Sequence, residues 1–121
     1  MDDTTTVADL KRAIADFVAE RDWSRNHDLK SLAVSVAIET AELLEHFQWL
    51  DRDESRNLMA DEGHRAEVAA EVADVLIYLL QFANAADIDL SEAFRTKMAR
   101  NALRFPVGLP WGSGDQTKLA R

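Results

Sequence analysis

Two pairs of carboxylates are the residues of this chain best suited to chemistry. Glu39 and Glu42 form one pair, and Glu71 and Asp74 form the other, in near-copies of one phrase, Glu-Thr-Ala-Glu-Leu-Leu and Glu-Val-Ala-Asp-Val-Leu. A spacing of three places both carboxylates of a pair on one side of a helix. Hard divalent cations prefer oxygen ligands, so the pairs predict a site for Mg²⁺, or for Mn²⁺ in its place.

The positions of the pairs also predict that they face each other. In an antiparallel hairpin of two helices, the pairs would be symmetric about a point between Arg56 and Asn57, inside a polar stretch where a loop is expected. Four like charges in a mostly apolar contact would repel one another and lose hydration, unless a cation lies among them. A single pair would be typical of a solvated helix face, whereas two pairs in register favour a metal site.

Hydrophobic periodicity predicts the elements that position these residues. Apolar residues at helical spacing indicate four main helices, over 5–22, 29–50, 64–86 and 91–104. Thr5 or Thr6 would cap the first, and Asp89 with Glu92 has the form of a capping box for the last. No strand-like alternation is found, so the expected fold is an all-α four-helix bundle.

The connections and the ends of the chain follow from composition. Residues 51–63 are expected to form a charged loop, with a short helix around 54–60 as the alternative. We expect one domain over 1–110 and a flexible tail over 111–121, which has no periodicity. The helix over 29–50 is apolar on nearly every side, which predicts burial between other helices or subunits and argues against a monomer.

Several classes of function are disfavoured by composition. The 121 residues include no cysteine, which excludes thiolate metal sites and cysteine nucleophiles and fits a reducing cytoplasm. The acidic start predicts no signal peptide, and no apolar run is long enough for a bilayer. The net charge of −8 argues against a nucleic-acid polymer or an anionic membrane as partner, but not against a small anion held through a metal.

Lys97, Asn101 and Arg104 are spaced by four and three, so they share one face of the last helix. Arginine can bind phosphate oxygens in bidentate fashion, and lysine acts as a point charge. Next to a metal site, these residues are candidates for binding a polyphosphate. Alternatively, the basic residues complement the dipole at the carboxyl end of the helix.

Other polar and aromatic residues extend the candidate site. Trp23 and Trp49 end the first two predicted helices and are flanked by polar residues, so they could stack on a nucleobase or serve as ordinary core or interface residues. His27 could bind a phosphate or a sugar, or simply belong to a loop. Lys30 is a further substrate-binding candidate. Glu45, one turn after Glu42, could take a proton from an attacking water or remain a solvated glutamate.

These motifs together resemble the all-α nucleoside triphosphate pyrophosphohydrolases of the MazG-like superfamily, with the small dCTP pyrophosphatase branch as the nearest. The resemblance spans about residues 6–106. The motifs that carry it are Phe17-Val-Ala-Glu-Arg-Asp-Trp23, His27, Glu39-x-x-Glu42-Leu-x-Glu45-x-Phe-Gln-Trp49, Glu71-x-x-Asp74-Val-Leu-Ile-Tyr78 and Lys97-Met-x-x-Asn101-x-x-Arg104-Phe105-Pro106. Three positions depart from the family pattern: Ile14, Ser31 and Ile38.

The resemblance implies a function and a role for each motif. Glu39, Glu42, Glu71 and Asp74 would hold Mg²⁺. Lys97, Asn101 and Arg104 would approach the phosphates, and Trp23, Trp49 and Tyr78 would lie around the base. The implied reaction is hydrolysis of (deoxy)nucleoside triphosphates to monophosphate and pyrophosphate, in dimers or dimers of dimers. One of Glu39, Glu42 and Glu45 would accept the proton of the attacking water.

Two other classes of protein are weaker interpretations of the same chain. A di-iron carboxylate bundle needs Glu-x-x-His pairs, and neither His46 nor His64 has a glutamate three residues before it. A non-catalytic helical interaction module would use its carboxylates only for solvation, and it predicts no stabilisation by metal.

Overall fold

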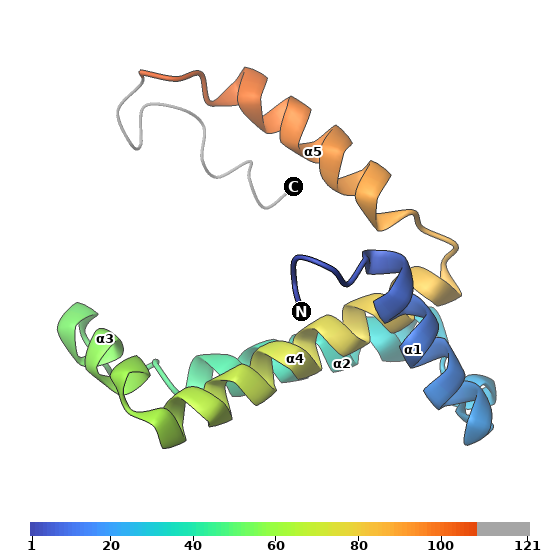
Figure 1. Cartoon of the computed structure of the whole chain (residues 1–121), viewed down its shortest axis with the longest axis horizontal. Coiled ribbons are helices and arrows are strands. Elements are labelled where there is room, and N and C mark those ends of the chain that lie inside the picture. Colours follow the sequence, from blue (N-terminus) through green and yellow to red (C-terminus); the bar gives the residue numbers. More distant parts are fainter. Residues whose placement is uncertain (109–121) are drawn as a thin grey trace. The chain divides into compact units, whose positions relative to one another are not determined.

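The computed structural model describes residues 1–108, and every regular element in that range is a helix. The elements are α1 (Val7–Glu20), the 3₁₀ helix η1 (Trp23–Asn26), α2 (Leu29–Glu45), α3 (Arg52–Ala60), α4 (Glu62–Ala85) and α5 (Leu90–Arg104) (Figure 1). The all-α class predicted from the sequence is confirmed. The chain forms two compact units, one over Met1–Asp87 and one that begins at Ile88 and contains α5. The predicted tail over 111–121 lies outside the described residues.

Each α-helix begins at a residue whose side chain accepts a hydrogen bond from a backbone N–H of the first turn. These residues are Thr6, Asp28, Asp51, Asp61 and Asp89. Such capping satisfies amides that have no partner inside the helix. At Thr6 the cap is reciprocal, because Asp9 accepts from the backbone N–H and the hydroxyl of Thr6, at 2.9 and 2.8 Å. The predicted start of the first helix at Thr5 or Thr6 is therefore confirmed at Thr6.

The region between the second and third predicted helices, 29–50 and 64–86, differs from the expectation. The helix predicted over 29–50 ends at Glu45, and the charged loop predicted over 51–63 contains the nine-residue α3. The reason is local, since Asp51 and Glu54 form a capping box that starts a new helix. Asp61 ends α3 and caps α4, which begins two residues before its predicted start. The alternative of a short helix around 54–60 was thus the better one.

The first unit is built around the pair α2 and α4, which run side by side, with α1 packed on α4 (Figure 1). The buried apolar side chains among the described residues are Leu32 on α2 and Val68, Leu80 and Ala83 on α4. Along α4 they fall on both sides of Glu71 and Asp74, so apolar contacts hold the helix pair before and after the acidic residues. No helix among residues 1–108 has the length and apolar character needed to cross a membrane.

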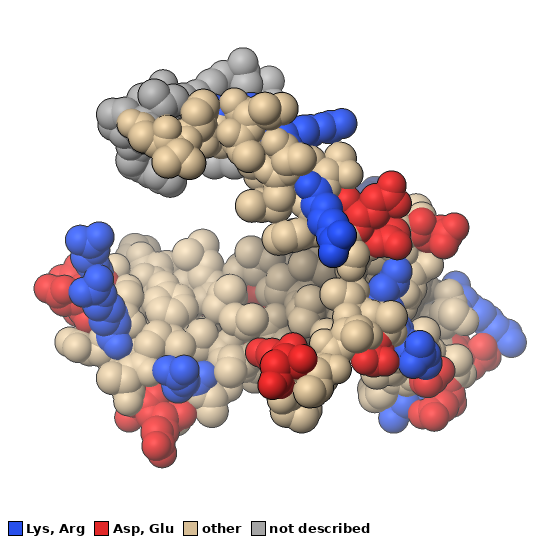
Figure 2. All heavy atoms as spheres, turned by 45° about the horizontal axis from the view of Figure 1, so that its top comes forward, with Lys and Arg blue, Asp and Glu red and all other residues tan. Residues whose placement is uncertain are grey.

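A strip of apolar side chains on α2 and α4 is left open to solvent in this single chain. Its members are Val34, Ile38, Val72, Leu76 and Leu79, which are between 43% and 52% exposed. On each helix they are spaced by three or four, so they follow one side. On the face drawn in Figure 2, residues other than Lys, Arg, Asp and Glu cover much of this unit. Each of the two helices therefore has an exposed apolar side, which is a candidate surface for contact with another protein chain.

Candidate metal centre and adjoining pocket

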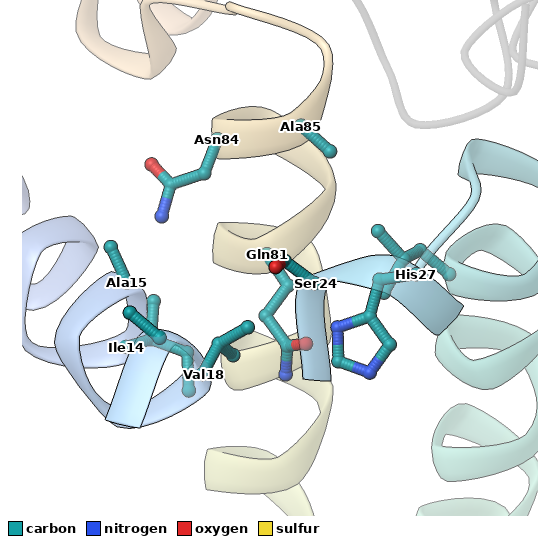
Figure 3. Close-up of a pocket in the computed structure, with 10 residues that line it drawn as sticks. Ile14, Ala15, Val18, Ser24, His27, Gln81, Asn84 and Ala85 are labelled. Carbon is teal, nitrogen blue, oxygen red and sulfur yellow. The ribbon is translucent and has the colours of Figure 1, made fainter. Parts of the chain in front are cut away.

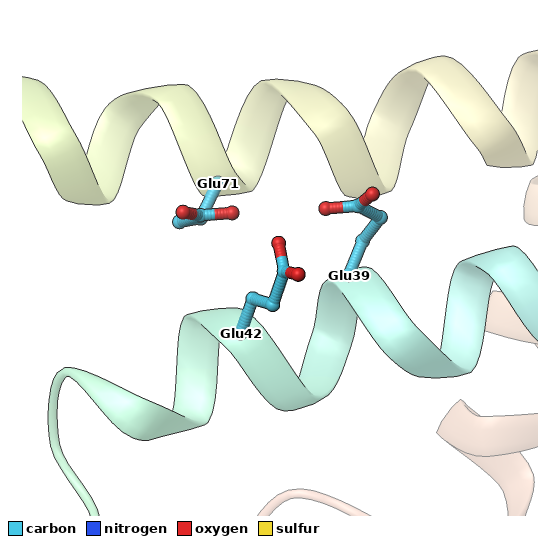
Figure 4. A group of neighbouring side chains, drawn as sticks. All are labelled: Glu39, Glu42 and Glu71. Carbon is cyan, nitrogen blue, oxygen red and sulfur yellow. The ribbon is translucent and has the colours of Figure 1, made fainter.

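Three carboxylates from two helices converge in the contact between α2 and α4. Glu39 and Glu42 come from α2 and Glu71 from α4, and each offers an oxygen that lies within 4.8 Å of the others (Figure 4). Mg²⁺ binds oxygens at ~2.1 Å, which separates ligands on opposite sides of the ion by about 4 Å. Small side-chain rotations would therefore bring all three oxygens onto one ion.

Asp74, the fourth predicted ligand, lies next to this group rather than within it. It is half-buried and lines a pocket together with Glu39. Its charge also raises the pKa of both Glu39 and Glu71. The structure thus brings the two pairs together across the hairpin. Three of the four carboxylates form one cluster, and Asp74 lies at its edge. Their role as metal ligands stays a prediction.

The electrostatics of the cluster favour a cation. Burial raises the pKa of Glu39, and the contact with Glu42 and the surrounding negative charges add to this. Burial also raises the pKa of Glu71, followed by the charges of Glu42 and Asp74, while His46 acts in the opposite direction. The His46 Nε2 lies 4.0 Å from the Glu71 Oε1. The fold therefore opposes the accumulation of negative charge here, and a bound cation would relieve it.

Two oxygens of the cluster lack any hydrogen-bond partner among the described residues. These are Oε2 of Glu39 and Oε2 of Glu71, and both are buried. A buried carboxylate oxygen without a partner costs free energy that protein folds rarely leave uncompensated. All donors of the cluster are oxygens, which suits Mg²⁺ or Mn²⁺ better than a softer metal. The residues present therefore fit a hard divalent cation.

A pocket of about 310 Å³ opens beside the carboxylates. Glu39 and Asp74 form its acidic side, and the rest of its lining is Ile14, Phe17, Val18, Trp23, Ile77, Tyr78 and Gln81. The rings of Phe17 and Trp23 meet edge to face, with their centroids 5.7 Å apart. The structure thus places Trp23 and Tyr78 in one pocket with two of the predicted ligands. A pocket with an acidic end and aromatic walls can hold a metal-bound anion that carries a flat ring.

A second cavity of about 260 Å³ adjoins the first and shares Ile14, Val18 and Gln81 with it. His27, a predicted substrate-binding residue, lines this second cavity, as do Ser24 and Asn84 (Figure 3). The Asn84 amide donates to the backbone carbonyl of Lys11 at 3.0 Å, which joins α4 to α1.

The remaining predicted residues of the first unit lie outside both cavities. Lys30 is exposed in the first turn of α2, and Glu45 is exposed as the last residue of that helix. Trp49 is 85% exposed in the turn between α2 and α3, rather than at the end of a helix as expected. This chain by itself does not bring Trp49 to the pocket, and the proposed contacts of these three residues stay predictions.

The predicted phosphate-binding residues lie on α5, in the second unit. Lys97, Asn101 and Arg104 are all half-buried, and their spacing places them on one face of this helix. The Arg104 guanidinium carbon lies 5.5 Å from the centroid of the Phe105 ring. The approach of these residues to phosphate groups stays a prediction.

Sequence reasoning missed Gln81, Ser24 and Asn84 as pocket residues. A signal for Gln81 was present, since Glu71, Asp74, Tyr78 and Gln81 follow one another at spacings of three and four on a single helix. Such spacing continues the face that carries the carboxylates. For Ser24, which comes from the 3₁₀ turn, the sequence offered no comparable periodicity.

Comparisons with known proteins show the family to which this chain is similar. The model of the MazG-like family matches residues 34–109. The chain is 39% identical over 108 residues to dCTP pyrophosphatase 1 from Mus musculus, and 38% identical over 104 residues to the protein of that name from Homo sapiens. These matches cover 89% and 86% of the chain, but 64% and 61% of the relatives, so the chain spans less than two-thirds of their length.

A solved structure extends the similarity to the fold. The crystal structure of a pyrophosphatase from Archaeoglobus fulgidus superposes with a TM-score of 0.76 and is 42% identical in sequence. The match covers 82% of this chain and 91% of that one.

Proposed function

The chain belongs to the MazG-like family, and from this premise we propose that it hydrolyses nucleoside triphosphates to nucleoside monophosphate and pyrophosphate in a Mg²⁺-dependent reaction. The observation that carries this proposal is the convergence of Glu39, Glu42 and Glu71, with two buried oxygens that lack partners, beside a pocket with aromatic walls. The relatives named dCTP pyrophosphatase 1 support dCTP, or a modified dCTP, as the preferred substrate. A role in sanitation or balance of the nucleotide pool would follow.

The cation would be held by Glu39, Glu42 and Glu71, with Asp74 at the edge of the cluster. When bound, Mg²⁺ supplies charge neutralisation at the phosphates and acidifies water. The protein's own contribution begins with position, because α2 and α4 fix the carboxylates beside the pocket that would hold the substrate. One of Glu39, Glu42 and Glu45 would accept the proton of the attacking water as its oxygen bonds to the α-phosphorus and pyrophosphate departs.

The other predicted residues complete the proposed site. Trp23 and Tyr78 would contact the base or the sugar through the pocket walls. Lys97 and Arg104 would neutralise charge on the β- and γ-phosphates, and Asn101 would add a hydrogen bond.

We also propose that the protein works as a homodimer or a homotetramer. The apolar strip over Val34, Ile38, Val72, Leu76 and Leu79 supports this, because a second copy would remove it from water. Replacing Leu76 with lysine would place a charge within the strip, and we expect a shift to the mass of a single chain in light scattering after size exclusion. An unchanged mass would place the subunit contact elsewhere.

The reaction can be tested with a panel of the common NTPs and dNTPs in Mg²⁺ or in EDTA, with products resolved by ³¹P NMR. We expect monophosphate and pyrophosphate only with Mg²⁺, and no turnover by Glu42→Gln or Asp74→Asn with the helical fold intact. Diphosphate and orthophosphate as products would overturn attack at the α-phosphorus. Absence of turnover with every triphosphate would instead favour a non-catalytic helical module, for which the exposed apolar strip is the supporting feature.

A further inference from the structure

Gln81 occupies the wall between the two cavities of the first unit. It lines both of them, and its Oε1 atom is buried without a hydrogen-bond partner among the described residues. Figure 3 shows the amide between Val18 of α1 and the imidazole of His27. Its surroundings are mostly apolar, with Ile14 and Val18 shared by the two cavities. A buried carbonyl in such a place lacks a donor that a ligand could supply.

The side-chain amide of Asn84, unlike the Oε1 of Gln81, has a hydrogen-bond partner within the fold. Asn84, one turn further along α4, donates to the backbone carbonyl of Lys11 and so helps to hold α1 against α4. This contact gives Asn84 a structural role. For the Oε1 of Gln81 there is no corresponding contact, so the fold gives no structural reason for a glutamine here rather than a leucine.

The position of Gln81 along α4 is suited to contact the base of a nucleotide whose phosphates lie at the carboxylates. Asp74, Tyr78 and Gln81 follow one another on one face of the helix and line the same pocket. The helix rises 1.5 Å per residue, so Gln81 lies ~10 Å beyond Asp74 along the axis. A nucleotide whose phosphates are held at the carboxylates would extend past Tyr78, and its base would arrive near Gln81.

We propose that Gln81 determines specificity for the base, and that its buried carbonyl accepts a hydrogen bond from an exocyclic amino group, as in cytosine. This inference rests on the proposed function, because it takes the ligand to be a nucleotide. Uracil carries an oxygen in place of that amino group, so with the Gln81 amide oriented as in this structure, its Oε1 atom toward the ligand, two acceptors would face each other. A site that leaves a buried acceptor unpaired discriminates strongly against such a ligand.

The test compares the pair dCTP and dUTP for the wild-type protein, Gln81→Leu and Gln81→Glu. The wild-type protein is expected to prefer dCTP, and Gln81→Leu to lose about tenfold in the ratio of kcat/KM for the two substrates, mainly through KM for dCTP. Gln81→Glu keeps an acceptor, so it should retain the preference while its added charge raises both KM values. Gln48→Leu makes the same substitution at an exposed position outside both cavities and should leave the ratio unchanged.

Two further readouts keep the test decisive. Gln81→Leu removes a buried carbonyl that lacks a partner, so its Tm should equal or exceed that of the wild-type protein, whereas a structural role predicts a lower Tm. Calorimetric binding of dCMP and dUMP with Mg²⁺ needs no turnover. If no triphosphate is hydrolysed, the proposed function fails, and loss of the dCMP preference in Gln81→Leu would still support the role of Gln81. An unchanged dCMP-to-dUMP ratio, or a wild-type protein without preference, would overturn it.

Discussion

Removal of one negative charge from the carboxylate cluster should have opposite effects with and without metal. Glu42→Gln keeps the size of the side chain and removes one of three carboxylates whose oxygens lie within 4.8 Å of one another. Without a cation these charges repel, and the raised pKa of Glu39 is in part a consequence of Glu42. In EDTA the variant should therefore be at least as stable as the wild-type protein. With Mg²⁺ it should gain little, because a ligand is missing.

The size of the metal effect follows from linkage. A ligand that binds only the folded state at one hundred times its Kd stabilises that state by about 2.7 kcal/mol. For a protein of about this length, each kcal/mol raises the Tm by several degrees, so Mg²⁺ should raise the Tm of the wild-type protein by ~10 °C. For Glu42→Gln we expect a shift of only a small fraction of that value.

Thermal melts followed by circular dichroism, in MgCl₂ and in EDTA, measure both effects. Glu67→Gln is the matched control, since it removes an exposed carboxylate from the same helix pair outside the cluster. It should keep the full shift with Mg²⁺. A Mg²⁺ shift in Glu42→Gln equal to that of the wild-type protein would refute the assignment of Glu42 as a ligand. Absence of a shift in the wild-type protein with both Mg²⁺ and Mn²⁺ would refute the metal site.

Three other predictions concern stability. The first is a pH dependence, measured by thermal melts in EDTA: stability should rise as pH falls from neutral toward about 4.5. The reason is that the pKa values of Glu39 and Glu71 are raised in the folded state, which therefore binds protons more tightly than the unfolded state does. Stability should fall again below about pH 4, where capping carboxylates with lowered pKa values, such as Asp28, become protonated; a monotonic profile would contradict this account. Leu32→Ala, at a side chain that is 2% exposed, should cost about 2–5 kcal/mol in urea unfolding, and a loss below 1 kcal/mol would show that the site is not tightly packed. Thr6→Ala should cost about 1 kcal/mol through the lost cap of α1, whereas Thr6→Ser should cost much less in the same assay.

The register of the acidic pairs could be predicted from the sequence because helix geometry leaves few alternatives. Three-residue spacing fixes which carboxylates share a side, and an antiparallel hairpin fixes which of them face each other. The convergence of Glu39, Glu42 and Glu71 followed from these two constraints alone. Asp74 lies at the edge of the cluster. A shift of its carboxylate by a few ångströms, along or around the helix, decides whether it can bind the metal or only lies near it. Residue spacing cannot resolve such a shift.

The ends of the helices were less predictable, because caps compete with hydrophobic periodicity. The apolar pattern continues to Leu50, yet α2 ends at Glu45 and a turn leads to the capping box at Asp51. The exposure of Trp49 is a consequence of this turn. The spacing of Lys97, Asn101 and Arg104 likewise showed that they share one face of a helix. Spacing within one helix does not reveal which element or ligand that face contacts. Contacts between helices depend on the apolar surfaces of both partners.

The arrangement of the core explains why a charged cluster can exist in this helix pair. Val68 is buried before Glu71, and Leu80 and Ala83 are buried after Asp74, so apolar contacts hold α4 on both sides of the acidic stretch. The carboxylates are thereby kept close together even without a cation, at the cost of mutual repulsion and of unpaired buried oxygens. A cation that enters this site finds its ligands already near their bound positions, so little ordering of side chains opposes binding. A bound cation would remove this repulsion, and the removal contributes to the affinity for metal. The Mg²⁺ dependence of the Tm is therefore the most direct measure of metal binding at this site.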